Sequence, residues 1–268
     1  MNTILFYPKN QIIKKHIKYI LFIGNSECFN DHSLTVFPNL NHCLGLLQHS
    51  ELNVINHSNL QIKPSNKEFH SYLTGIYHHP ITFKYEGKID EICIEFEPNG
   101  IEKLFGINAS RHVFVNNVIE NLLNLKFKEL YNVAFNYKKP LLRGMMIEQF
   151  LLKSISSKIK SSIPSFLHIE SKTNDDLQKE LHLSKRSIHR LFKNNLGITP
   201  NTYLNIKRFR NLLELFGSDL SQSQIAYLLE FADQSHMIRD FRKNTNTTPK
   251  KFQQNSLCIE NEIWCMLN

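Results

Sequence analysis

The chain has 268 residues, with 32 Lys plus Arg against 24 Asp plus Glu, so its formal net charge is +8 at pH 7. Apolar side chains make up 41% of the residues, 19 of them Phe, whereas glycine contributes only 9. This composition excludes a disordered chain and a collagen-like chain, and the length favours a basic protein of two domains.

The amino-terminal part is predicted to be a mainly antiparallel β domain. From Lys18 to about Pro98, short alternating runs are broken by Asn, Pro, Gly and His. The first apolar run, Tyr19–Ile23, is too short to cross a bilayer and is not followed by a small-residue cleavage site. We therefore expect a buried strand there, no membrane partner and a cytoplasmic protein.

The clearest strand is Ile89–Glu97. Residues 85–88 have the composition of a hairpin turn, which predicts that this strand pairs with Ile81–Tyr85. Alternation gives it an apolar face, formed by Ile92, Ile94 and Phe96. The opposite face carries Glu91, Glu95 and Glu97, which could resemble a catalytic pair but which we interpret as a solvated polar face.

Helical spacing follows the β region. A short helix is expected around residues 101–105 and a longer one over residues 141–159. Residues 156–164, rich in Ser and Lys, are interpreted as a linker. The predicted domains are therefore residues 1–160 and residues 161–256, followed by a tail over residues 257–268.

The positive charge is concentrated in residues 171–255. This segment has 14 Lys plus Arg against 8 Asp plus Glu, a net of +6, which leaves +2 for the rest of the chain. It also holds six of the eight arginines. Arginine makes forked contacts with phosphate and guanine, so its enrichment favours a nucleic-acid surface over an ordinary solvated face.

The same segment contains an internal repeat. Residues 177–184 align with residues 225–232 at an offset of 48, and residues 188–203 align with residues 237–252 at an offset of 49. Each copy is predicted to form a helix, a turn of about three residues and a second helix, which is the spacing of a helix-turn-helix unit. A long helix from Pro200 to about Phe216 would join the two units.

Helix-capping residues stand at every predicted boundary. The capping boxes are Thr173 with Asp176 and Ser221 with Gln224; the N-caps of the second helices are Ser184 and Asp233; Thr199-Pro200 and Thr248-Pro249 begin the following helices. The second helix of each unit buries an apolar stripe and leaves polar and cationic residues outside. These predicted DNA-binding residues are Lys185, Arg186, Ser187, His189, Arg190 and Lys193 in the first unit, and Gln234, Ser235, His236, Arg239, Arg242 and Lys243 in the second.

The segment resembles the paired helix-turn-helix domain of AraC/XylS-type transcription regulators. The resemblance covers about residues 165–255 and rests on the runs 232–236, 239–242 and 248–252. It implies that the second helix of each unit, the recognition helix, enters one of two successive major-groove segments of double-stranded DNA. His182, Glu230 and Asn246 occupy turn positions where the family usually has glycine, so we expect backbone strain at Glu230.

The stretch from Gly75 to Gly106 resembles an uncharacterised domain found ahead of such regulators. The whole chain is therefore expected to be α+β, with a mainly antiparallel β amino-terminal domain over residues 1–160 for sensing or self-association and an all-α carboxy-terminal domain over residues 161–256 for DNA binding. The expected function is sequence-specific transcription regulation, with a small-molecule effector, RNA polymerase and a second copy of the chain as further partners. Regulation by dimerisation alone, without an effector, stays open as an alternative.

Catalytic and metal-binding motifs are not apparent in the sequence, so we expect no enzyme, no metal and no cofactor. The five cysteines lack a C-x-x-C pair, and none of the six histidines between residues 42 and 79 has His-x-His spacing. An enzyme or a methyl-accepting sensor tethered to DNA is the alternative function. A zinc-bound methyl acceptor needs four clustered thiolates, whereas only Cys28, Cys43 and Cys93 precede the linker.

Overall fold

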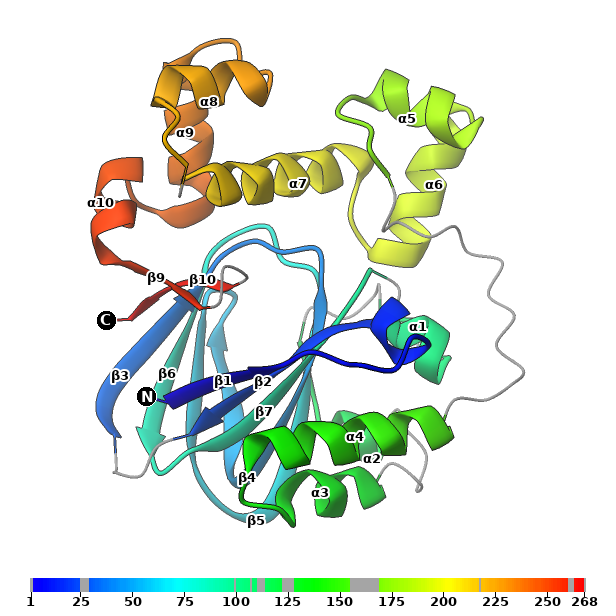
Figure 1. The fold of residues 1–268 in the computed structure, drawn as a ribbon, viewed down its shortest axis with the longest axis vertical. Helices are drawn as coiled ribbons and strands as arrows, with labels where there is room; N and C mark the ends of the chain where they lie inside the picture. The colour runs from blue at the N-terminus through cyan, green and yellow to red at the C-terminus, as the bar shows by residue number, and fades with distance from the viewer. Residues whose placement is uncertain are drawn as a thin grey trace.

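The computed structural model describes residues 2–24, 29–98, 100–106, 108–109, 114–121, 128–154, 169–216, 218–259 and 263–267. A β-rich amino-terminal domain lies below a helical carboxy-terminal domain in Figure 1. This arrangement confirms the expected α+β class. The interpretation of residues 156–164 as a linker lies outside the described residues. None of the helices in the described ranges has both the length and the hydrophobicity needed to cross a membrane.

The described strands form a curved sheet in the order β1-β2-β7-β4-β5-β6-β3-β10-β9, with β8 paired to β5. They are β1 (Asn2–Phe6), β2 (Ile17–Gly24), β3 (Phe29–Val36), β4 (His42–Asn56), β5 (Asn59–Thr74), β6 (Ile81–Gly87), β7 (Asp90–Phe96), β8 (Phe114–Asn116), β9 (Ser256–Ile259) and β10 (Ile263–Leu267). Neighbouring strands are antiparallel except β5 and β6. The predicted antiparallel β domain is therefore confirmed.

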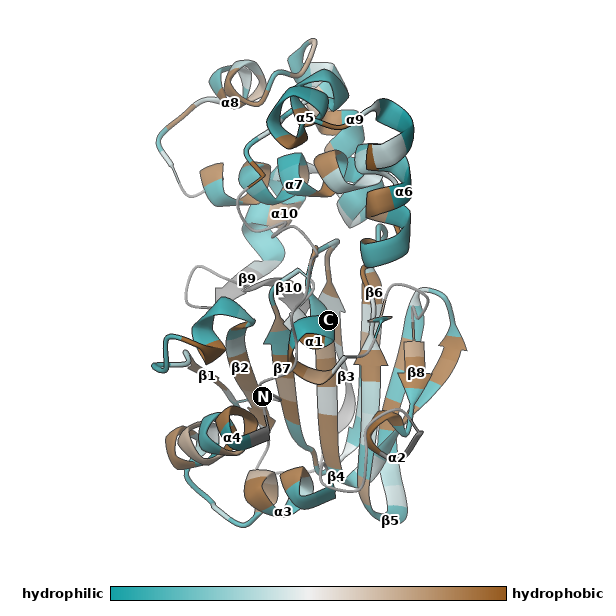
Figure 2. Ribbon diagram, turned by 90° about the vertical axis from the view of Figure 1, so that its right-hand side faces the viewer, coloured by the Kyte–Doolittle hydropathy of each residue, from teal (hydrophilic) through white to brown (hydrophobic). Residues whose placement is uncertain are grey.

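Helices cover one face of this sheet. They are the 3-10 helix Ile13–Lys15 and α1 (Gly100–Phe105), α2 (Val118–Asn121), α3 (Lys128–Phe135) and α4 (Pro140–Ser154). Ile92, Ile94 and Phe96 of β7 are fully buried in the apolar cluster between the sheet and these helices. Brown, hydrophobic bands alternate with paler or teal bands along several strands of this sheet in Figure 2.

The predicted hairpin between β6 and β7 is wrong. β6 pairs with β3 and β5, whereas β7 pairs with β2 and β4. The two strands separate because their apolar side chains join different cores: Phe83 and Tyr85 of β6 lie inside the curved sheet, and Ile92 and Ile94 of β7 lie under the helices. Alternation along a strand identifies its buried face but not its neighbour.

The carboxy-terminal domain consists of two helix-turn-helix units and the long helix between them, as predicted. Its helices are α5 (Asn174–Leu181), α6 (Lys185–Leu196), α7 (Pro200–Leu215), α8 (Gln222–Leu228), α9 (Gln234–Thr245) and α10 (Pro249–Asn255). The predicted capping boxes and N-caps form at all six helix starts. The three turn positions where the family usually has glycine adopt the left-handed backbone conformation that glycine favours: φ is 52° at His182, 57° at Glu230 and 57° at Asn246.

The internal repeat is visible in the packing of aromatic side chains. In the first unit Phe192 and Tyr203 meet edge to face, with ring centroids 5.1 Å apart. The equivalent residues of the second unit, Phe241 and Phe252, meet in the same way at 5.2 Å. In each unit this contact joins the recognition helix to the helix that follows, so the offset of 49 residues corresponds to a duplicated core.

The two domains contact each other at both ends of the helical domain. Asn108 donates a hydrogen bond of 3.1 Å from its side chain to the backbone oxygen of Asn194, at the end of α6. At the other end, the rings of Phe37 and Phe252 pack edge to face at 5.1 Å. α7 lies across the top of the curved sheet between these two contacts (Figure 1).

Candidate functional site

The first recognition helix, α6, presents an exposed cationic surface. Its buried stripe contains Ile188, Phe192 and Leu196, each at most 2% exposed. Most of the predicted DNA-binding residues on the opposite face are exposed: Lys185, Arg186, His189, Arg190 and Lys193. Ser187 is half-buried, and its hydroxyl lies 3.0 Å from that of the N-cap residue Ser184.

The second recognition helix, α9, repeats this arrangement. The exposed residues are Gln234, Ser235, Arg239, Arg242 and Lys243. His236, which aligns with Ser187 at the offset of 49, is also half-buried: its ring packs edge to face on Phe231, and its Nδ1 accepts a hydrogen bond of 3.4 Å from the backbone amide of Ala232. This ring therefore also supports the turn that precedes α9.

The helix α7 holds the two recognition helices apart. Its 16 residues correspond to a length of about 24 Å. Arg208 of α7 lies 3.7 Å from the carboxylate of Asp240 on α9, and its guanidinium lies over the ring of Phe231 at 4.3 Å. Lys172, which precedes α5, forms an ion pair of 2.8 Å with Glu230 in the second turn. The two units are therefore connected by polar contacts as well as by α7.

The loop around His78 lies near the carboxy-terminal halves of both recognition helices. The pKa of His78 is lowered by burial and then by three neighbouring groups: His79, Lys243 and Lys193. Both lysines are predicted DNA contacts, one from each unit. Sequence reasoning missed this proximity, because no local pattern relates a loop of the β domain to helices more than a hundred residues away.

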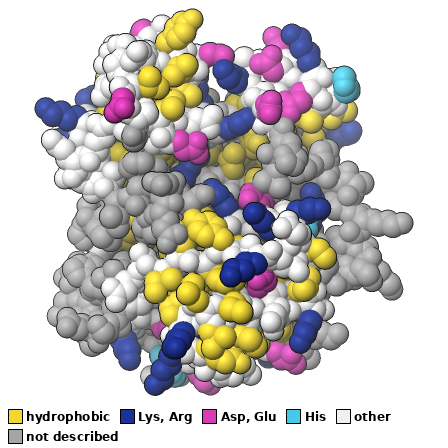
Figure 3. Space-filling view, in the orientation of Figure 1, with side chains coloured by type: hydrophobic (Ala, Val, Ile, Leu, Met, Phe, Trp, Pro, Cys, Tyr) yellow, Lys and Arg dark blue, Asp and Glu magenta, His cyan; other side chains and the backbone are white. Residues whose placement is uncertain are grey.

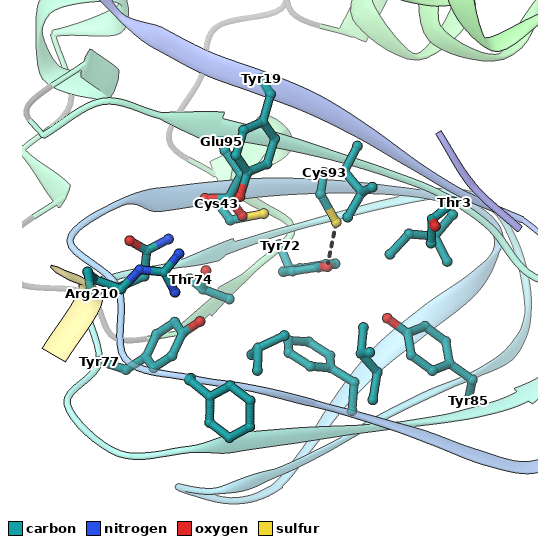
Figure 4. A pocket seen from close by; sticks show the side chains of 17 residues that line it. Thr3, Tyr19, Cys43, Tyr72, Thr74, Tyr77, Tyr85, Cys93, Glu95 and Arg210 are labelled. Carbon is teal, nitrogen blue, oxygen red and sulfur yellow. Dashed lines mark hydrogen bonds between the residues drawn. The ribbon is translucent and has the colours of Figure 1, made fainter. Parts of the chain in front are cut away.

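A cavity of about 80 Å³ lies inside the curved sheet, at the end that faces the helical domain. Its wall is mostly apolar and aromatic, with polar groups at one end where Glu95, Tyr77 and Arg210 approach each other (Figure 4). The polar or ionisable lining residues include Tyr19, Asn39, Cys43, Tyr72, Thr74, Tyr77, Tyr85, Cys93, Glu95 and Arg210. Mostly apolar walls with a few convergent polar groups are typical of small-molecule sites.

The interpretation of the β7 carboxylates as a solvated face is wrong for Glu91 and Glu95. Glu91 is fully buried and accepts hydrogen bonds from the hydroxyls of Tyr72 and Tyr85, the latter at 3.0 Å. Glu95 lines the cavity, and burial raises its pKa to about 7. Both faces of β7 are covered because the sheet curls over one face while the helices pack on the other.

Arg210 is a lining residue that comes from the other domain. It projects from α7 to the polar end of the cavity, where its charge opposes the rise in the pKa of Glu95 caused by burial. A molecule in this cavity would therefore touch the helix that joins the two recognition helices. The sequence contains one weak indication that Arg210 has a role apart from DNA binding. Arg210 belongs to the arginine-rich segment, but it lies on the connecting helix and not on a recognition helix.

Cys43 and Cys93 also line the cavity. Hydrogen bonding with Cys93 and burial raise the pKa of Cys43, which makes its thiolate form unfavourable. Within the described residues, His, Cys, Asp and Glu side chains do not form a group of three or more suited to a metal ion. Cys28, the third cysteine ahead of the helical domain, lies outside the described residues.

Comparison with known proteins finds similarity in the helical segment. A family model described as a helix-turn-helix domain matches residues 177–255. The HTH-type transcriptional activator RhaS of Escherichia coli O139:H28 (strain E24377A / ETEC) is 34% identical over 89 residues, which are 32% of this chain and 32% of that relative. RhaS of Salmonella arizonae is 38% identical over 79 residues, or 28% of each chain. The chain thus matches about a third of the length of these relatives.

Among solved structures, ToxT from Vibrio cholerae is similar with a TM-score of 0.43 and 15% sequence identity, over 86% of this chain and 97% of that one. The fold and the exposed cationic helices of residues 174–255 define a paired helix-turn-helix domain. The family model and the RhaS relatives support the same assignment for this segment: residues 177–255 match a helix-turn-helix domain, and the RhaS relatives carry a similar segment.

Proposed function

We propose that the chain is a sequence-specific DNA-binding transcription regulator and not an enzyme. Its two recognition helices, α6 and α9, would enter successive major-groove segments of one duplex. The observation that carries this proposal is the duplicated, exposed cationic face, held at a fixed spacing by α7 within a segment that matches a helix-turn-helix family model and resembles the AraC/XylS type. Exposed Arg and Gln side chains would read base edges, and Lys and Ser would bind phosphates.

Substitution of one arginine in each recognition helix tests this function. We expect Arg190→Ala and Arg239→Ala each to weaken specific binding by about 1–3 kcal/mol and to relax base preference in one half of the site. Gel-shift titrations on fragments selected by genome-wide binding-site mapping measure both effects. Lys139→Ala, at an exposed cation of the amino-terminal domain, serves as the control and should bind normally. Equal affinity for all DNA sequences would contradict the proposal.

We further propose that the cavity binds a small-molecule effector. The lining favours a compact, largely apolar molecule with one polar group, which would lie between Glu95 and Arg210. Because Arg210 belongs to α7, such a molecule would contact both domains and would bias the position of the recognition helices.

A thermal-shift screen of the full chain tests the effector proposal. A compound at about a hundred times its dissociation constant should add about 2.7 kcal/mol to the free energy of unfolding. Arg210→Ala should reduce that gain, whereas Asn211→Ala, at an exposed position next to it on α7, should not. A screen without any stabilising compound, or a gain that both variants retain, would count against the cavity as the effector site.

Two exposed apolar surfaces suit the protein partners expected of such a regulator. Figure 3 shows yellow side chains gathered over α8 and over α4. Tyr227 and Leu228 on α8 are 84% and 49% exposed, and Leu141 on α4 is 60% exposed. We propose that α8 contacts RNA polymerase and that α4 contacts a second copy of the chain. A transcription reporter assay of Tyr227→Ala tests the contact with RNA polymerase, and wild-type reporter activity would contradict it. Sedimentation of Leu141→Glu tests the contact between two copies of the chain, and wild-type sedimentation would contradict it.

A further inference from the structure

The residues that follow the helix-turn-helix domain return to the amino-terminal domain. β10 pairs with β3 in antiparallel register, with Leu34, Thr35 and Val36 opposite Leu267, Met266 and Cys265. β9 then pairs with β10 and lies at the edge of the sheet. The amino-terminal domain is therefore discontinuous in sequence, and the DNA-binding domain is inserted between α4 and β9 (Figure 1).

The strand that receives this tail forms part of the cavity wall. Leu34 and Val36 of β3 line the cavity, and Phe37 directly after β3 lines it as well. Cys265 is fully buried and belongs to the same apolar cluster as Leu34, Tyr72 and Tyr85. Pairing with β10 covers the edge of β3 that would otherwise carry unpaired backbone amides and carbonyls. The tail therefore completes the sheet around the cavity.

The same tail is joined directly to the second helix-turn-helix unit. α10 ends at Asn255 and β9 begins at Ser256, so no connecting residue separates the helix from the strand. Phe252 of α10 is fully buried and packs on Phe37, the residue that follows β3. A displacement of the second unit relative to the cavity is therefore expected to disturb the β9–β10 pairing or the β3–β10 pairing, or to move β3 with it.

We propose that strands β9 and β10 act as a clasp, which fastens the second helix-turn-helix unit to the cavity wall through β3. The clasp couples three features: the packing of β3, the occupancy of the cavity and the position of α9. Its regulatory part rests on the proposed function, since it links an effector in the cavity to DNA bound by α9. Coupling of this kind is reciprocal, so DNA bound at α9 also alters the stability of β3.

Val36→Cys tests the clasp geometry in the full chain. Directly opposed residues of an antiparallel pair have Cα atoms about 4.5–5.5 Å apart, within the range that a disulfide bridges. We expect the new thiol to form a disulfide with the native Cys265 under mild oxidation, detected as one linked peptide pair by mass spectrometry. Val36→Cys combined with Cys265→Ser should not give that pair, and neither should Ser33→Cys, which is out of register with Cys265. Absence of the linked peptide in the first variant would overturn the clasp.

Removal of the tail tests the coupling. A chain ending at Asn255 keeps the whole matched segment 177–255 but loses β9 and β10. We expect amide exchange of residues 34–36 to rise at least tenfold relative to the full chain. Specific duplex DNA should slow exchange in β3 of the full chain and leave the truncated chain unaffected. Unchanged exchange on truncation, or equal DNA effects in both chains, would overturn the coupling. Failure of both chains to bind DNA would instead refute the proposed function and leave the disulfide result standing.

Discussion

Individual side chains show how closely this protein packs its polar groups. Tyr72 reaches Glu91 across the interior because Gly45 leaves room for its ring, and a Cβ at that glycine would collide with it. Burial raises the pKa of Glu91, and the hydrogen bonds from Tyr72 and Tyr85 oppose that rise. The network satisfies a carboxyl group that would otherwise be costly to bury.

At position 230, glycine should be more stabilising than a residue that has a Cβ. Glu230 has a φ of 57°, in the left-handed region, which costs a residue with a Cβ about 1 kcal/mol or more relative to glycine. Its ion pair with Lys172 joins side chains that are more than half exposed, so that contact contributes little. We expect Glu230→Gly to unfold with a free energy about 1 kcal/mol higher than Glu230→Ala, which lacks the ion pair but keeps the Cβ. Urea unfolding of both variants measures the difference, and equal stabilities would contradict it.

Glu95 should make the stability of the protein depend on pH. Burial raises its pKa to about 7, whereas an unfolded Glu titrates near about 4.3, so the folded chain keeps a proton that the unfolded chain has lost between these values. The contribution of Glu95 to the free energy of unfolding therefore falls as the pH rises from about 4.5 to about 7. We expect Glu95→Gln to match the wild type near pH 4.5 and to exceed its stability by about 1–3 kcal/mol at pH 8.

The difference between variant and wild type isolates this effect from other titrating groups. Burial lowers the pKa of His42 to about 4, so His42 costs stability as the pH falls from about 6.5 toward 4, the opposite trend in an overlapping range. Both proteins contain His42, so its contribution cancels. Glu214→Gln, which replaces an exposed carboxylate on α7 in the same way, is the matched control. If the difference in free energy of unfolding between Glu95→Gln and the wild type stays constant from pH 4.5 to pH 8, Glu95 is not the group that causes this pH dependence.

Helices and strands differ in how much of them the sequence predicts. Each helix of the carboxy-terminal domain begins at an N-cap and carries a stripe with helical spacing, so its start, its end and its buried face are all local properties. Strand β7 was also located correctly, and its apolar face was correctly identified. Its partners were not, because pairing with β2 and β4 depends on which strands the chain brings alongside and not on β7 itself.

The charge of the whole molecule leads to a prediction about how DNA affinity depends on salt concentration. The carboxy-terminal segment carries most of the net +8, so DNA binding should release counterions and weaken steeply as salt rises. We expect Lys185→Gln to reduce the slope of log affinity against log salt concentration by about the amount that one phosphate contact contributes. Lys153→Gln, an exposed cation at the end of α4, should leave the slope unchanged. Filter-binding titrations at several salt concentrations measure the slopes, and identical slopes for all three proteins would exclude a phosphate contact at Lys185.

The sequence by itself determined the class of the fold, the duplicated helix-turn-helix domain with its caps, and the residues exposed on most of each recognition helix. These features follow from spacing, capping and charge within about 50 residues. Only the tertiary structure decided that Glu91 is buried, that Glu95 and Arg210 line the cavity, and that the tail pairs with β3. These contacts join segments far apart in the chain, and a strand edge or a cavity wall acquires its neighbours only when the whole sheet has curled closed.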